Sequence, residues 1–379
     1  MKIRHILNVL MLSAFGFLLI TCSFTVSDTS APWPTEGWEK SLPEEQGMDS
    51  ALLAEMLSLI EERDYEIDSI LIIRNGYLVT DIYVHPFAPN TKHVINSCTK
   101  SVVSALIGIV VDEGYIHGVD QPILEIFSDR DVANLEPSKE QITLEDVLSM
   151  SSGLDCKDSY LYRWSGLREM WNSEDWVQFV LDLPMAHEPG TYFEYCNGGS
   201  FLLSAVVQER TGKTALDFAN EKLFGPLGIE NVTWRENPQG ISIGWGGLEM
   251  IPYDMAKIGY LYLNGGEWDG GQIIPSSWVE SSTTEHIDAT LQDGYGYQWW
   301  VDDDGVYMAL GYAGQFIFVM PEKSLVVVFT SDLKERDFYV PQQLLEAYII
   351  PAAQSSQALP KNTKGVEQLE LMIERLAQP

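Results

Sequence analysis

Ser97 and Lys100 are the first residues in this sequence whose types and spacing could do chemistry. Residues three positions apart on a helix share one face, with Cβ atoms roughly 5 to 6 Å apart, so the lysine amine could reach the serine hydroxyl. The partial positive charge at a helix start favours a serine alkoxide, while burial disfavours the charged form of a lysine and lets it act as a base. Together they have the geometry of an activated nucleophile.

The residues after Lys100 separate this pair from a helix cap followed by a surface lysine. Residues 102–111 are almost all apolar, which predicts a helix that runs through a core. A lysine that leads into such a helix needs a partner or a function. We therefore interpret Ser97 as a nucleophile and Lys100 as its base.

Two later stretches carry further polar chemistry. Tyr195 and Asn197 lie in a glycine-rich loop ahead of a helical pattern over residues 200–209. A phenol is a poor base at its ordinary pKa near 10, but a neighbouring lysine ammonium favours the phenolate. Tyr195 is thus expected to relay a proton from the nucleophile to a leaving group. The third stretch, residues 311–315, precedes a strand hairpin.

Strand patterns near both ends of the chain must position these stretches. A helix is predicted over residues 50–63, and the middle of the chain, residues 120–290, is mainly helical. The predicted strands are 67–73, 77–84, 295–301, 306–310, 316–320 and 325–330, followed by helices from 342 and over 365–377. Asn75-Gly76 is a hairpin turn signal between the first two strands. The pattern predicts an α+β fold with one antiparallel sheet assembled from both chain ends.

The three stretches resemble the motifs of the serine β-lactamase and penicillin-binding protein superfamily, in its class C-like branch. The matching residues are Ser97-Cys98-Thr99-Lys100, Tyr195-Cys196-Asn197 and Gly311-Tyr312-Ala313-Gly314-Gln315. Their order and spacing agree, and the last form is similar to that of the 6-aminohexanoate-dimer hydrolase and carboxylesterase relatives. The resemblance implies a β-lactamase/transpeptidase-like fold and a serine hydrolase that needs no cofactor.

The same resemblance implies a role for each site residue. Ser97 would be acylated, Lys100 would be its base and Tyr195 the proton relay. Asn197 would orient Lys100 and the substrate amide, and the backbone N–H groups of Ser97 and Gln315 would form the oxyanion hole. One such preorganised donor is typically worth about 2.7 to 4 kcal/mol.

The third stretch departs from the pattern of true β-lactamases at Tyr312. Those enzymes have Lys-Thr-Gly where this chain has Tyr312-Ala313-Gly314, so a substrate carboxylate would lack its ion pair. We expect Gly314 to let an edge strand approach the substrate closely, while Tyr312 either contacts substrate or only packs. Small esters, amides or peptides are therefore the expected substrates. Three alternatives stay open: a β-lactamase, a DD-peptidase acting on cell-wall peptides, and a catalytically silent binding or scaffolding member of the fold.

Composition restricts the partners. The 379 residues contain 23 Lys and Arg against 55 Asp and Glu, a formal net charge of −32. Because nucleic acids and anionic membranes are themselves polyanions, this balance argues against both as partners. A small-molecule substrate is the expected partner.

The first residues of the sequence resemble an export signal. Basic residues precede an apolar run over 6–20, which has the length of a signal h-region and is short for a membrane span. Residues 1–22 are thus interpreted as a signal peptide, with a lipid anchor at Cys22 and ordinary cleavage both open. The hydrolase domain is expected over 36–352, and a linker and C-terminal helix over 353–379. The expected location is the periplasm, the cell envelope or the medium.

Four cysteines are too few for a disulfide framework and lack metal-ligand spacing. Cys98 and Cys196 both lie inside the motifs. A disulfide there stays open, but small buried residues are the favoured interpretation.

Overall fold

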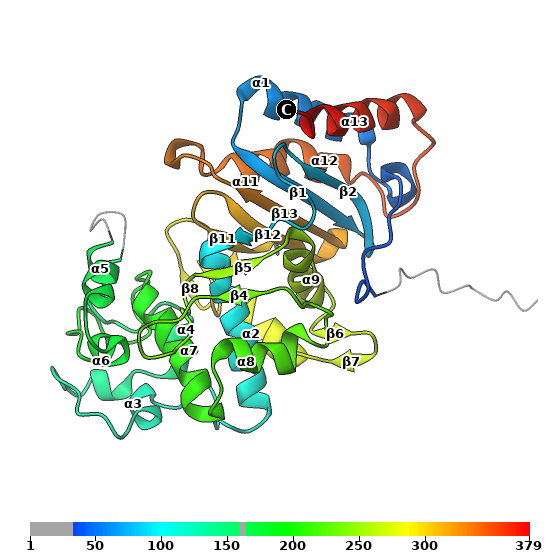
Figure 1. Cartoon of the computed structure of the whole chain (residues 1–379). Coiled ribbons are helices and arrows are strands. Elements are labelled where there is room, and N and C mark those ends of the chain that lie inside the picture. The colour runs from blue at the N-terminus through cyan, green and yellow to red at the C-terminus, as the bar shows by residue number, and fades with distance from the viewer. Residues whose placement is uncertain (1–32, 159–163) are drawn as a thin grey trace, which may run out of the picture. The chain divides into compact units, whose positions relative to one another are not determined.

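An eight-stranded antiparallel sheet forms the centre of the computed structural model, which describes residues 33–158 and 164–379 (Figure 1). In spatial order its strands are β2 (Tyr77–Tyr83), β1 (Ile67–Arg74), β13 (Leu325–Ser331), β12 (Gln315–Met320), β11 (Tyr307–Gly311), β10 (Trp300–Val301), β9 (Gly294–Tyr295) and β8 (Ile287–Asp288). β1 pairs with β13, so that Ile70 lies opposite Phe329. The predicted sheet from both chain ends is therefore confirmed.

Local sequence explains the first elements. Helix α1 (Ser50–Arg63) begins where the Asp49 side chain accepts a hydrogen bond from the Ala51 N–H, as helix-capping aspartates do. The β1–β2 hairpin turns at Asn75 and Gly76, whose φ angles of 52° and 83° are those of a two-residue turn that suits the strand twist. Both predicted elements are confirmed.

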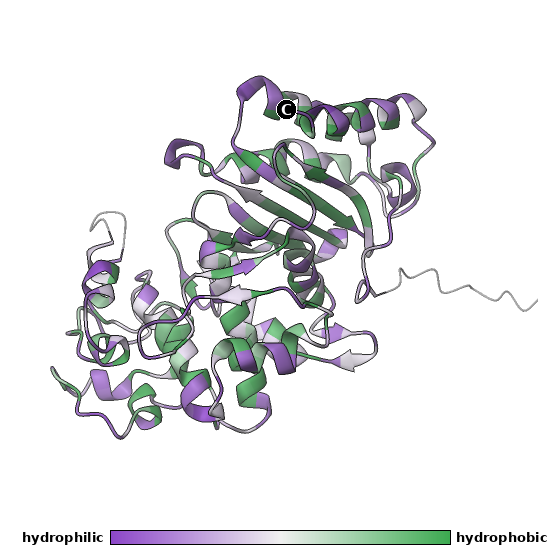
Figure 2. Ribbon diagram, in the orientation of Figure 1, coloured by the Kyte–Doolittle hydropathy of each residue, from purple (hydrophilic) through white to green (hydrophobic). Residues whose placement is uncertain are grey.

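Helices cover both faces of the sheet. On one face lies α1, against which the C-terminal helix α13 (Thr363–Leu376) packs (Figure 1). On the other face lies α9 (Pro252–Leu263), where the missing side chain of Gly259 leaves room for Val326 and Ile317 of the strands. Figure 2 shows the strands as the most continuous hydrophobic part of the chain, as expected for a sheet that is buried on both faces.

The helical region carries the first two motifs, while the third lies in the β11–β12 hairpin. α2 (Thr99–Asp112) packs against α7 (Asn197–Thr211), and both are buried over most of their length. The remaining α-helices of the described residues are α3 (Ile123–Ile126), α4 (Leu144–Leu148), α5 (Ser165–Trp171), α6 (Trp176–Leu181), α8 (Ala215–Ala219), α10 (Ser276–Ser282), α11 (Val340–Leu344) and α12 (Ile350–Ala352). One small sheet contains β3 (His93–Val94), β5 (Leu248–Met250) and β4 (Thr233–Trp234). Another contains β6 (Glu267–Trp268) and β7 (Gly271–Gln272).

One predicted strand is wrong in part. Residues 295–301 do not form one strand. Tyr295 is the last residue of β9, Trp300 is the first of β10, and the chain turns between them at Gln298, whose φ is 63°. The Gln298 amide explains the turn, because it is buried and reaches back to donate to the Leu148 carbonyl at 2.7 Å.

The predicted signal segment, with Cys22, lies outside the described residues. Within residues 33–158 and 164–379, no helix has both the length and the apolar character needed to cross a membrane.

Candidate active site

Ser97 lies in a single 3₁₀ turn, Asn96–Cys98, that leads from β3 directly into α2. The turn begins with Asn96 in the left-handed region, at φ 48°, a conformation that is uncommon for residues other than glycine. The Asn96 side-chain amide donates to the Tyr312 carbonyl at 2.9 Å. This contact joins the first motif to the third and holds Ser97 at the start of a buried helix, as predicted.

Lys100 is 2% exposed and uses its amine on three oxygens. Nζ lies 3.1 Å from Ser97 Oγ, 2.9 Å from Asn197 Oδ1 and 3.2 Å from the Trp245 carbonyl oxygen. Burial lowers the pKa of Lys100 from 10.5 to about 7, although the nearby Asp158 carboxyl and Cys98 thiol raise it. A large fraction of neutral amine is therefore present near neutral pH, and that form can accept a proton from Ser97.

Tyr195 lies beside this pair and presents its ring face to the Lys100 amine. The ring centroid is 4.7 Å from Lys100 Nζ, and Trp300 stacks on the ring with centroids 6.0 Å apart. The residue keeps partial exposure, yet burial of its surroundings raises its pKa, which a hydrogen bond with Ser97 only partly offsets. The expected phenolate is therefore wrong, because a cation over the ring face does little for the charge on the phenol oxygen. A neutral Tyr195 hydroxyl can still pass a proton.

The third motif meets the nucleophile through its backbone. The Cys98 thiol donates to the Gln315 carbonyl at 3.4 Å. A methyl group added at Gly311 would lie 3.2 Å from Ser97 N. The Gln315 side chain is buried and donates to the Ser331 carbonyl at 2.5 Å, so it is engaged away from Ser97.

Contrary to expectation, the strand that follows Gly314 is not at the edge of the sheet. β12 lies between β11 and β13 and is no edge strand. Gly314 occupies the hairpin turn at φ 87°, and a Cβ there would lie 2.7 Å from Leu333. It is thus needed for the turn and for packing. Tyr312, in the same turn, is 66% exposed.

Sequence reasoning missed Asp158, a carboxylate that is only 2% exposed. Its oxygens accept the backbone N–H of Asn197 at 2.8 Å and of Leu167 at 2.7 Å. Nothing in the sequence near Asp158 marks it, because its burial is created by α5 and α7. The contact between Lys100 and the Trp245 carbonyl was also missed, because a backbone carbonyl is present at every residue and no side-chain type marks it.

The cysteine expectation is half wrong. Cys98 is free and buried, as expected, but Cys196 forms a disulfide with Cys156, 40 residues earlier. Their Cα atoms are 5.5 Å apart, within the ordinary range for disulfides. The bond fastens the segment that carries Asp158 to the Tyr195–Asn197 motif.

Aromatic side chains border the motifs. Trp164 meets Tyr195 edge to face at 6.4 Å, and Trp171 meets Trp245 in the same manner at 6.4 Å. Trp164 and Trp171 are 39% and 52% exposed. Exposed indole faces of this kind offer an apolar surface beside Lys100 and Tyr195.

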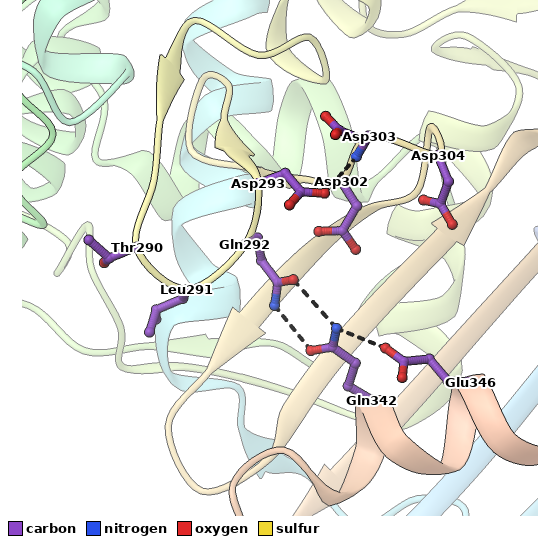
Figure 3. Close-up of a pocket in the computed structure, with 9 residues that line it drawn as sticks. All are labelled: Thr290, Leu291, Gln292, Asp293, Asp302, Asp303, Asp304, Gln342 and Glu346. Atoms are coloured by element: carbon purple, nitrogen blue, oxygen red, sulfur yellow. Dashed lines mark hydrogen bonds between the residues drawn. The ribbon is translucent and has the colours of Figure 1, made fainter.

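A separate hollow of about 480 Å³ contains none of the predicted site residues (Figure 3). Its lining residues are Thr290, Leu291, Gln292, Asp293, Asp302, Asp303, Asp304, Gln342 and Glu346. Burial and the neighbouring Asp293 and Asp304 carboxylates raise the pKa of Asp302 to about 6. In the part of the chain that the structure describes, no three His, Cys, Asp or Glu side chains are placed to hold a metal ion.

The chain is similar to several known hydrolases. The 6-aminohexanoate-dimer hydrolase of Paenarthrobacter ureafaciens is 26% identical over 312 residues, which are 75% of this chain and 78% of that protein. A family VIII carboxylesterase has a similar fold, with a TM-score of 0.66 at 14% identity over 82% of this chain and 98% of its own. A hydrolase with promiscuous acyltransferase activity reaches 0.68 at 16% identity, over 79% and 99%.

The family model described as Beta-lactamase matches residues 52–347. That range includes all three motifs and the whole of the central sheet. The chain therefore belongs to the beta-lactamase family and is a hydrolase of its serine type.

Proposed function

We propose that the chain hydrolyses small neutral esters or amides through an acyl-enzyme on Ser97. The observation that carries this proposal is the Lys100 amine, which is buried, has a pKa near 7 and lies 3.1 Å from Ser97 Oγ. A scaffold protein would have no use for such a group, since burying a lysine destabilises the fold.

In the proposed reaction, the Ser97 Oγ–H proton moves to neutral Lys100 as Oγ attacks the substrate carbonyl carbon. The backbone N–H groups of Ser97 and Gln315 stabilise the oxyanion that forms. The Tyr195 hydroxyl, hydrogen-bonded to Ser97, passes the proton on to the departing alcohol or amine. Water then attacks the acyl-enzyme by the reverse route and frees Ser97.

Neutral substrates are favoured by the mouth of the site. Tyr312, which is exposed there, can donate only an uncharged hydrogen bond, and the chain's net charge of −32 repels anions. The exposed faces of Trp164 and Trp171 suit an apolar acyl or leaving group. The names of the relatives, a 6-aminohexanoate-dimer hydrolase and a carboxylesterase, also support an amide or ester substrate.

The test is to treat the purified protein with a fluorophosphonate and with a labelled penicillin and to measure its intact mass. We expect a fluorophosphonate adduct and turnover of a p-nitrophenyl ester, both lost in Ser97→Ala. Ser101→Ala is the matched control, because Ser101 is buried on the same helix but donates to the Gln298 carbonyl. An efficient penicillin adduct would favour the β-lactamase or DD-peptidase alternative, and no adduct would favour the silent one.

Export is a separate part of the proposal. The apolar run over residues 6–20 supports it, and so does the Cys156–Cys196 disulfide, because such bonds persist in oxidising compartments. We propose that the mature protein begins at Cys22 or shortly after it, with or without a lipid on that cysteine. N-terminal sequencing and mass measurement of the native protein test this, and a native chain that begins at Met1 would contradict it.

A further inference from the structure

Asp158 lies next to the catalytic machinery without touching Ser97. Its two oxygens accept the backbone N–H groups of Asn197 and Leu167, which belong to the first turns of α7 and α5. A carboxylate that is 2% exposed is rare in proteins unless it is paired or has a function. Helix capping alone would be served by a serine or an asparagine, so the negative charge needs another reason.

The Asn197 side chain links Asp158 to Lys100. Asn197 Oδ1 accepts the Lys100 amine at 2.9 Å, and the same side chain lies close enough to Asp158 to lower the pKa of that carboxyl. An ionised carboxylate can only accept, so it must face the amide nitrogen of Asn197. The amide oxygen is then directed toward Lys100. Asp158 thus selects one of the two orientations of the Asn197 amide.

The position of Asp158 is itself fixed. Cys156, two residues earlier, is bonded to Cys196, the residue before Asn197. On the other side, a Cβ on Gly166 would lie 1.7 Å from the Cys156 carbonyl oxygen and 3.1 Å from Asp158 Oδ1. Close packing on one side and a covalent bond on the other leave the carboxylate little freedom to turn.

We propose that Asp158 is a positioning residue of the acylation reaction: through Asn197 it holds the Lys100 amine against Ser97 and supplies a negative charge near that amine. This inference rests on the function proposed above, in which Lys100 is the base. Asp158 does not touch the reacting atoms.

The charges around the pair agree with this role. Asp158 and Cys98 are the groups that raise the pKa of Lys100 against the effect of burial. The Cys98 thiol is itself kept protonated, because burial raises its pKa. Burial raises the pKa of Asp158 above its ordinary value, and the hydrogen bonds from Asn197 and Leu167, together with Lys100, reduce that rise. Asp158 in turn helps to raise the pKa of Glu194. Among the described residues, Asp158 is thus the carboxyl group that favours the Lys100 ammonium.

Asp158→Asn tests the proposal, because it keeps the size of the side chain and removes the charge. The pKa of Lys100 should fall, so the acid limb of kcat/KM for a p-nitrophenyl ester should move to lower pH by about one unit. A freely turning Asn197 amide should also lower kcat at the plateau by about 10-fold or more, a loss in the range reported for misplaced catalytic groups. Asp155→Asn is the matched control, since Asp155 lies on the same segment and pairs with Lys157.

The second measurement needs no turnover. The rate at which fluorophosphonate labels Ser97, followed by intact mass against pH, should show the same shift in Asp158→Asn and none in Asp155→Asn. Where Asp158→Asn does not fold, Asp158→Ser removes the charge with less bulk and keeps an oxygen that can accept from Asn197.

The outcomes are distinct. A folded, less active Asp158→Asn whose acid limb coincides with that of the wild type would make Asp158 a structural cap and overturn the inference. A wild-type protein that is never labelled at Ser97 would instead refute the proposed function itself.

Discussion

Replacing Lys100 by methionine should abolish activity and also remove a pH dependence of stability. Methionine has a similar length and no charge, so it fills the same buried space. Lys100→Met leaves the Asn197 and Trp245 oxygens without a donor, which destabilises the fold by an amount that does not depend on pH. This pH-independent destabilisation cancels when the difference in stability between variant and wild type is compared at two pH values.

The pH-dependent part can be worked from the pKa. The Lys100 pKa falls from 10.5 to about 7 on burial, and each factor of ten in protonation is worth about 1.36 kcal/mol. Between pH 7 and 10.5 the unfolded chain holds this proton and the folded chain does not, so the free energy of unfolding rises with pH in that window. Below pH 7 the folded protein bears the full cost of burying the charged amine, about 4 to 5 kcal/mol. From pH 6 to pH 9.5 the free energy of unfolding of the wild-type protein should rise by about 3 kcal/mol.

Urea unfolding of wild-type and Lys100→Met protein at pH 6 and pH 9.5 measures this quantity. The stability of the variant relative to the wild type should be about 3 kcal/mol higher at pH 6 than at pH 9.5. Ser97→Ala is the matched control: it is equally inactive but keeps Lys100, so it should follow the wild type at both pH values.

A relative stability that is the same at pH 6 and pH 9.5 would refute the reasoning. It would mean that Lys100 stays protonated in the folded protein over this range, and the general base would have to be sought elsewhere.

Other perturbations have definite expected outcomes. Because Lys100 must be neutral to act, kcat/KM for an uncharged p-nitrophenyl ester should rise with pH and reach half its plateau near pH 7; a profile flat from pH 5 to 9 would contradict this. Gly311→Ala should slow acylation by about 10² to 10³, since the added methyl group would lie 3.2 Å from Ser97 N and 2.6 Å from the Ile95 carbonyl; labelling rates and melting temperatures separate the site effect from destabilisation. Tyr312→Lys should improve a chromogenic cephalosporin relative to the neutral ester by supplying a charge-assisted contact worth about 1.5 to 3 kcal/mol, and an unchanged ratio of the two kcat/KM values would show that Tyr312 does not control selectivity.

Much of the fold could be predicted because its signals are local. The predicted helix over residues 50–63 matches α1, and Asn75-Gly76 forms the hairpin turn. The apolar run after Lys100 became a buried helix because no face of it is polar. Where the prediction was wrong, a distant contact decides: Gln298 breaks a strand pattern because its amide bonds to Leu148, 150 residues away.

The site residues likewise divide into those that local sequence predicts and those that depend on distant contacts. Ser97 and Lys100 lie close in sequence, and local geometry brings them together. Asp158 could not be predicted, because a carboxylate followed by aromatic residues gives no sign of being buried. The predicted direction of the Tyr195 pKa was wrong for a related reason: burial raises that pKa, and the burial comes from distant parts of the chain that the spacing of the motifs does not show.

The pairing of β1 with β13 has a consequence for how the chain is made. Ser69 and Thr330 are joined by a side-chain hydrogen bond across 261 positions, so the β1–β2 hairpin has an open edge until nearly the whole chain has left the ribosome. Contacts this far apart in sequence form slowly, and an unpaired apolar strand is prone to associate with other chains. A chain that stops before Leu325 would keep all three motifs but lack β13, so β1 and β12 would each have one unpaired edge. Premature termination should therefore yield aggregates rather than a smaller enzyme, and the nascent protein should depend on chaperones until its last strand is complete.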